Sequence, residues 1–440
     1  MTVAINGPIQ SQVMNTLNNL VMRKVRPQFE CLPAIDAVGA FEAEWNRVVS
    51  GFSRLAPSRV AVCVGSREVS NMVPVARAVV AKLKSIGHEP FITPAMGSHG
   101  GACAEGQIKV LERLGVTEQS IGAPVMATME VVEAGEVDGI PLLFDRLAWE
   151  ADGIVVINRI KEHTDFSGPT QSGIIKMMAI GLGNQAGANL YHGLGLTGNL
   201  YQVISTAGLE LSRRAPFWFG VGLVENQLHE TVRLSILTAD MLPHEEAKLL
   251  NDAKKGLPRL PLTDVDLLIV DEIGKNVSGG GMDPKVTGRN PVVGCENDSD
   301  IRISRIFVRD LTDESEGNAI GIGQADFTTD RLVKKTDLAA TAMNCVTCAL
   351  PECAKMPIAY PTDREAIYTA LTTIRPHTQS DLRLVRIRNT SDLDTFFVST
   401  GCLPVLQATP FVTIEPDPMG LEFDSTGNLL NWYTPRHTHN

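Results

Sequence analysis

The chain has 440 residues, with 39 Lys and Arg against 50 Asp and Glu, so its formal net charge is −11. This acidic balance argues against partners such as nucleic acid or an anionic membrane surface, and no run of roughly 18 apolar residues predicts a transmembrane helix. The eight cysteines beside 14 methionines, and a first segment without the features of a secretion signal, favour a cytoplasmic globular protein of about two or three cores.

Strand and helix patterns alternate from residue 59 onward. β-branched or apolar runs predict strands, whereas apolar spacing near 3.6 followed by glycine predicts helices. The expected strands are 59–64, 90–96, 124–132, 141–144 and 152–158, and the expected helices are 74–87 and 104–115. This order predicts an α/β fold with a mostly parallel or mixed sheet flanked by helices.

A segment dense in Gly, Lys, His and Asn follows at 159–200, and the α/β pattern resumes after it. Its expected strands are 218–224, 230–240, 265–274 and 383–388, and its expected helices are 243–256, 329–344 and 362–373. Two prolines in 257–264 indicate a hinge, and 275–291 is a glycine-rich loop. We expect two α/β domains, 1–257 and 258–410, and a tail, 411–440, that packs on either domain.

Two histidines lie in loops that follow expected strands, where α/β sheets usually carry their sites. His99 is flanked by glycines, and it either approaches a ligand or merely caps the next helix. His163 shares its loop with Arg159 and Lys161, which form a basic locus in an acidic chain. This locus suits a carboxylate or phosphate, although a solvated basic loop explains it equally well.

Lys176 interrupts the apolar, glycine-bounded segment SGIIKMMAIGLG. Such a lysine either extends to the surface or is desolvated, and a desolvated amine is a nucleophile or a covalent attachment point. His192 follows in NLYHGLG, as a structural histidine or as a ligand for nickel, zinc or copper. The histidine spacing excludes an HExxH-type zinc site.

Three cysteines in NCVTCALPEC, Cys345, Cys348 and Cys353, are close enough in sequence to hold zinc or an iron–sulfur cluster with Cys295 or Cys402. We favour packing, because small cysteines pack like alanine in the helix expected there. The chain lacks the motifs of serine hydrolases, P-loop NTPases and Rossmann dehydrogenases.

The ordered set GSR (65–67), GSHGG (97–101), HTDFSG (163–168), Lys176 and His192 resembles the nickel-pincer lactate racemase family of 2-hydroxyacid racemases and epimerases. The resemblance implies two α/β domains with the active site in the cleft between them, and a cofactor-binding N-terminal domain. It also implies that proteins of cofactor biosynthesis act on the chain, and it leaves a homo-oligomer open.

The resemblance assigns the cofactor residues. Lys176 is similar to the lysine that covalently holds the pyridinium-3-thioamide-5-thiocarboxylic acid mononucleotide with its nickel. His192 is similar to the nickel ligand, and Ser66 lies in the turn expected at the cofactor. His99 and His163 are similar to the paired acid/base histidines.

The resemblance also assigns the substrate contacts, with Arg67 near the cofactor and substrate and Lys285 in the second domain on the carboxylate of a small anionic hydroxyacid. Lys275 and Arg289 compete with Lys285 for that role. Lactate-specific members have arginine at the position of Gly100, so the resemblance implies a divergent member that acts on another hydroxyacid, such as a sugar acid.

The function that follows is inversion of C2 by reversible hydride transfer, with a histidine taking the hydroxyl proton on either face of the substrate. Two alternatives stay open from the residues alone. One is a metal-dependent dehydratase or hydrolase whose histidine cluster binds the metal directly, and the other is a non-catalytic protein that binds sugar acids.

Overall fold

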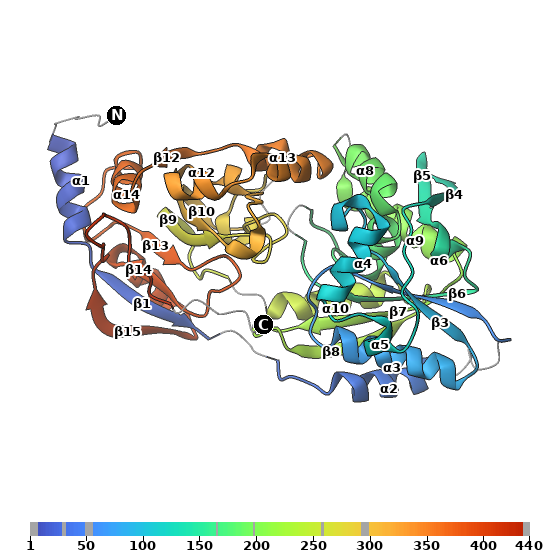
Figure 1. The fold of residues 1–440 in the computed structure, drawn as a ribbon. Coiled ribbons are helices and arrows are strands. Elements are labelled where there is room, and N and C mark those ends of the chain that lie inside the picture. Colours follow the sequence, from blue (N-terminus) through green and yellow to red (C-terminus); the bar gives the residue numbers. More distant parts are fainter. Residues whose placement is uncertain are drawn as a thin grey trace. The chain divides into compact units, whose positions relative to one another are not determined.

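The computed structural model describes residues 8–28, 32–48, 56–163, 166–196, 199–256, 259–291 and 299–433. The chain forms two compact units, an N-terminal unit, Glu30–Leu257, and a C-terminal unit made of Met1–Phe29 with Pro258–Asn440 (Figure 1). Both units are mixed α/β, which confirms the predicted fold class. Within the described ranges, no helix is long and apolar enough to span a membrane.

The sheet of the N-terminal unit has five strands in the order β3-β2-β6-β7-β8, parallel except for β8. A separate hairpin joins β4 and β5. The strands of the unit are β2 (Arg59–Val64), β3 (Glu89–Pro94), β4 (Val131–Val137), β5 (Ile140–Asp145), β6 (Gly153–Arg159), β7 (Phe217–Glu225) and β8 (Thr231–Leu237).

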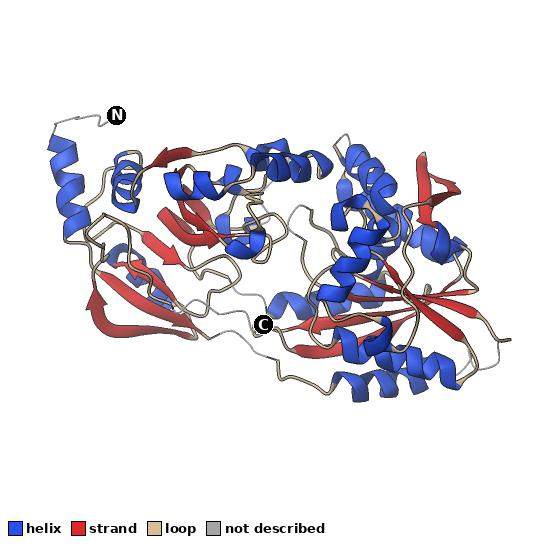
Figure 2. Ribbon diagram, in the orientation of Figure 1, coloured by secondary structure: helices blue, strands red, loops and turns tan. Residues whose placement is uncertain are grey.

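Helices cover both faces of this sheet (Figure 2). Alternate residues of β2 explain why, since Val60 and Val62 face α2 and α3 whereas Ala61 and Cys63 face α7, α9 and α10. The helices are α2 (Ala37–Val48), α3 (Met72–Ser85), α4 (Ala104–Arg113), α5 (Glu118–Ile121), α6 (Arg146–Trp149), α7 (Ile174–Lys176), α8 (Asn184–Gly195), α9 (Leu200–Arg214) and α10 (His244–Lys255), with a 3₁₀ turn, η2 (Gly100–Ala102), and a π-helix, η3 (Met177–Gly181).

The C-terminal unit contains an eight-stranded sheet in the order β12-β11-β10-β9-β13-β14-β1-β15, parallel from β12 to β13 and antiparallel beyond. Its strands are β1 (Met22–Pro27), β9 (Asp264–Ile273), β10 (Arg302–Leu311), β11 (Phe327–Thr329), β12 (Ile358–Tyr360), β13 (Leu384–Ile387), β14 (Phe396–Ser399) and β15 (Val412–Met419). Its helices are α1 (Pro8–Asn18), α11 (Pro284–Thr287), α12 (Asp330–Lys335), α13 (Leu338–Thr347), α14 (Asp363–Thr372) and α15 (Leu403–Ala408), with 3₁₀ turns η4 (Asp313–Ser315), η5 (Ile322–Gln324), η6 (Pro351–Ala354) and η7 (Thr400–Cys402).

The division of the chain follows residue 257, where the hinge was expected, but the first 29 residues belong to the C-terminal unit. The reason is strand pairing, because β1 lies between β14 and β15. The tail packs on the same unit, through β15 and through the buried side chain of Leu429.

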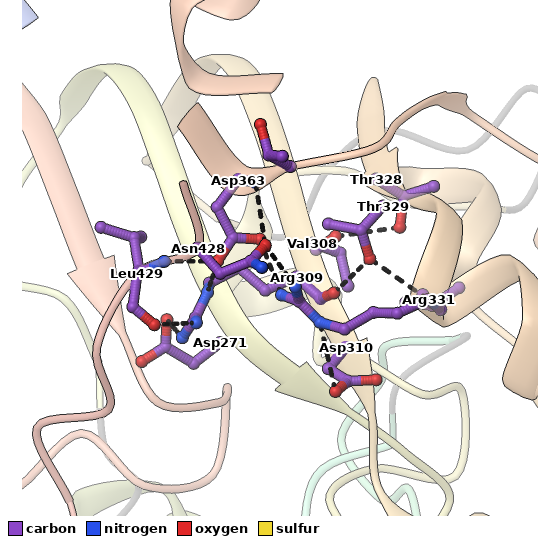
Figure 3. A network of polar contacts seen from close by, with 12 residues as sticks. Asp271, Val308, Arg309, Asp310, Thr328, Thr329, Arg331, Asp363, Asn428 and Leu429 are labelled. Carbon is purple, nitrogen blue, oxygen red and sulfur yellow. Dashed lines mark hydrogen bonds and ion pairs between the residues drawn. The ribbon is translucent and has the colours of Figure 1, made fainter. Parts of the chain in front are cut away.

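A buried ionic network fixes the tail to the C-terminal unit (Figure 3). Arg309 at the end of β10 donates to Asp271 at 2.9 Å and to Asp363 at 2.8 Å. It also donates to the carbonyl oxygen of Leu429 at 2.6 Å, and the Leu429 amide donates to Asp363 at 2.8 Å. Each buried charge therefore has a partner, as a stable interior requires.

The three clustered cysteines lie in or against a small apolar cluster of the C-terminal unit, with Cys348 only partly buried. Cys345 and Cys353 are 1% exposed and pack with Ile320 and Leu350 in a small apolar cluster. Cys402 belongs to a different part of the core, and Cys295 lies outside the described residues.

Candidate functional site

The winding of the N-terminal sheet reverses at β2. The chain passes from β2 through α3 to β3 on one side of it, and later enters β6 on the other side. In open α/β sheets, ligands bind outside the carboxyl ends of the strands at such a reversal. The turn that carries Ser66 follows β2, and the loop that carries His163 follows β6, so both leave the sheet at this point.

The turn after β3 holds His99 through backbone contacts made by glycine. The Gly97 amide donates to the carbonyl oxygen of Gly181 at 3.0 Å, and Gln107 donates from Nε2 to the carbonyl oxygen of Gly97 at 2.9 Å. Gly97 has a φ of 59°, which favours glycine. His99 Nδ1 lies 2.5 Å from Ser66 Oγ, so these two predicted residues contact each other.

The loop after β6 is closed by a short backbone bridge, in which Lys161 and Ser172 exchange two hydrogen bonds at 2.9 and 3.1 Å. This bridge brings His163 back toward the sheet. Its amide donates to Gln171 Oε1 at 2.6 Å, and its ring stacks on Phe166 with centroids 4.2 Å apart. The imidazole is therefore held in a defined orientation.

Lys176, at the end of α7, meets this imidazole. Its Nζ lies 2.6 Å from His163 Nε2, and both side chains are half-buried. An ammonium group only donates, so the imidazole accepts when the lysine is charged, and a neutral amine accepts when the imidazole donates. In either case the two nitrogens share one proton, which is the arrangement of a nucleophilic amine beside a general base.

A buried carboxylate that the sequence analysis missed lies beneath α7. Glu246 of α10 is fully buried, and its Oε2 accepts from the amides of Ile174 at 2.9 Å and Ile175 at 3.2 Å. Burial raises the pKa of Glu246 to about 7, although both hydrogen bonds lower it. The available signal was its position on the face of the expected helix that also carries Leu249 and Leu250.

The basic locus at the end of β6 is partly neutralised. Arg159 forms an ion pair with Glu225, which also accepts from the Ser70 amide at 2.5 Å. Burial alone would raise the pKa of Glu225, but His229 and Arg159 hold it below its ordinary value. Arg159, which was expected to bind an anionic ligand, thus pairs with a carboxylate of the chain itself.

The remaining predicted residues lie in three places. Arg67 is exposed in the turn after β2. His192 is half-buried in the last turn of α8, a helix that contacts the π-helix following Lys176. Lys285 lies in α11 of the C-terminal unit and is 7% exposed. Its place beside the other residues in an interdomain cleft stays a prediction. Among the described residues, no group of three or more His, Cys, Asp or Glu side chains is arranged to hold a metal.

No protein-family model matches this chain, and no curated protein matches it. Among solved structures, the fold is similar to that of the lactate racemase apoprotein from Thermoanaerobacterium thermosaccharolyticum, with a TM-score of 0.50 and 11% sequence identity. The similarity covers 77% of this chain and 87% of that one. At this identity it shows a shared fold.

Proposed function

We propose that the chain is an isomerase, a racemase or epimerase of 2-hydroxyacids, that carries a nickel-pincer nucleotide on Lys176. The observation that carries the proposal is the contact between Lys176 Nζ and His163 Nε2 at 2.6 Å. It pairs an amine with a base at the sheet reversal, in a fold similar to that of a lactate racemase apoprotein.

The residues present fit such a cofactor. Lys176 supplies an amine for covalent attachment, and His192 supplies an imidazole from a helix that contacts the segment following Lys176. One imidazole suits a metal that arrives with most of its ligands on an organic group. Ser66 lies in the turn at the same edge of the sheet. When bound, the cofactor supplies an acceptor for hydride.

The histidines supply the proton transfers. A neutral imidazole takes the proton of the substrate hydroxyl and returns it at neutral pH, and each such transfer contributes about 10²–10⁴-fold in rate. Ser66 orients the ring of His99 through Nδ1, and Phe166 with Gln171 orients His163. Two oriented bases permit proton removal from either enantiomer.

The test is the intact mass and metal content of the full chain produced together with cofactor-making enzymes. We expect an adduct of mononucleotide mass on the peptide that contains Lys176, with about one nickel per chain. Lys176→Ala should abolish the adduct, whereas Lys109→Ala, which removes an exposed lysine of α4, should retain it. Bound zinc or iron without an adduct would contradict the proposal and favour the dehydratase or hydrolase. If the chain carried neither an adduct nor a metal, the result would contradict the proposal and favour the sugar-acid-binding protein.

A further inference from the structure

Helix α7 lies in a slot formed by glycines of neighbouring elements. A Cβ at Gly208 of α9 would lie 2.2 Å from the carbonyl oxygen of Ile175, and one at Gly220 of β7 would lie 2.7 Å from the side chain of Ile174. A Cβ at Gly173, which precedes the helix, would lie 2.2 Å from Glu246 Oε1. All three distances are shorter than atoms tolerate, so α9 and β7 can approach α7 this closely because each presents a glycine to it, and Glu246 of α10 can do so because residue 173 is a glycine.

The first turn of α7 depends on Glu246 for its hydrogen bonds. The residue before the helix is Gly173, which has no side chain to accept from the free amides of the turn. Glu246 Oε2 accepts from both Ile174 and Ile175, whereas its Oε1 has no hydrogen-bond partner among the described residues. A carboxylate held in this way is expensive to bury, and apolar packing alone would not require it.

We propose that Glu246 is a positioning residue for Lys176, and that it fixes the first turn of α7 so that the lysine amine meets His163. The inference rests on the proposed function, in which that amine attaches the cofactor. Helix α7 runs directly into the π-helix Met177–Gly181, and a helical segment this short is not stable by itself. Each helical residue is rotated by about 100° from the last, so loss of the turn would carry Nζ away from Nε2.

The test measures the reactivity of Lys176 in the full chain without cofactor. N-acetoxysuccinimide is the probe, and peptide mass spectrometry gives the ratio of acetylation at Lys176 to that at Lys109, an exposed lysine of α4. We expect Glu246→Leu to lower this ratio about tenfold or more, since the amine loses its adjacent base. Glu246→Gln retains an oxygen acceptor and should keep the ratio within about threefold.

The matched control is Glu245→Leu, which changes the neighbouring residue, whose side chain is exposed and pairs with Lys248. It should leave the ratio unchanged. If Glu246 only stabilised the fold, its loss would change the acetylation of Lys176 and of Lys109 together and leave the ratio unchanged. The ratio therefore separates a positioning role from a purely structural one. If Glu246→Leu does not fold, Glu246→Ala gives the same comparison.

Two outcomes are decisive. If His163→Gln lowers the ratio and a folded Glu246→Leu or Glu246→Ala does not, the positioning role is wrong while the proposed function stands. If His163→Gln leaves the ratio as in the wild type, the activated amine is absent and the proposed function loses its support, whatever Glu246 does.

Discussion

Glu246→Gln should change how the stability of the N-terminal unit depends on pH. Burial raises the pKa of Glu246 from 4.5 to about 7. The difference of about 2.5 units corresponds to about 3 kcal/mol of unfolding free energy. Because the folded chain binds this proton more tightly than the unfolded chain, the contribution is fully present below pH 4.5 and is lost as the pH rises through 7.

Glutamine does not titrate, so the unfolding free energy of the variant does not fall with rising pH through this residue. Its buried NH₂ group, next to Gly173, instead carries a constant penalty of about 1–3 kcal/mol. The difference in unfolding free energy, variant minus wild type, should therefore become more positive by about 2.5 kcal/mol between about pH 5 and about pH 8, whatever the sign of the difference at pH 5.

Urea unfolding followed by tryptophan fluorescence measures this difference. Trp45, Trp149 and Trp218 lie in the N-terminal unit, and a Trp432→Phe background removes the signal of the other unit. Glu245→Gln is the control and should show no such change. A constant difference for Glu246→Gln across this pH range would refute the argument, because it would mean that the buried carboxylate does not titrate within it.

Three further predictions concern other contacts. Arg309→Leu removes a buried cation shared by Asp271 and Asp363, leaves each carboxylate with one arginine, Arg386 or Arg331, and should lower the unfolding free energy by about 3 kcal/mol. Arg302→Leu, at a side chain 79% exposed, should change it by about 0.5 kcal/mol at most, and similar losses for both variants in urea titrations would contradict this. Ser66→Ala removes the hydroxyl that contacts Nδ1 of His99 and should lower kcat of the loaded enzyme about tenfold or more, while the adduct on Lys176 keeps its mass. An unchanged kcat would exclude the orienting role. Gly208→Ala forces a methyl group against the α7 backbone and should lower the thermal midpoint through about 1–3 kcal/mol of overpacking; an unchanged midpoint would contradict the close approach.

Elements with a local signal were predictable from the sequence. The β-branched run RVAVCV became β2 within the predicted bounds, and the amphipathic pattern at 243–256 became α10. The run 124–132 was wrong as a single strand, because only its end joins the hairpin of β4 and β5. That hairpin turns at Asp138 and Gly139, both with positive φ.

Elements that depend on distant partners were not predictable. β1 reads MRKVRP, a cationic run without strand alternation, and it becomes a strand because β14 and β15 pair with it from the other end of the chain. β10 was also missed, since three arginines interrupt its apolar pattern. One of them, Arg309, is buried only because Asp271 and Asp363 neutralise it.

The candidate site divides in the same way. Residue type and apolar surroundings single out Lys176 and His163, but their contact depends on a loop closed by the bridge between Lys161 and Ser172. Glu246 carries no motif, and its function depends on the glycine-lined approach of α10 to α7. Such contacts arise from tertiary packing, which local patterns do not encode.

The most direct test of the proposed function follows a hydroxyacid deuterated at C2, supplied as one enantiomer to the full chain loaded with cofactor. Lactate and a panel of sugar acids serve as substrates, with His163→Gln as the inactive control. Inversion by hydride transfer predicts a product of opposite configuration that retains deuterium at C2, because the hydride returns to the carbon that it left. Inversion with deuterium replaced by hydrogen from water, or no inversion of any substrate, would contradict the account.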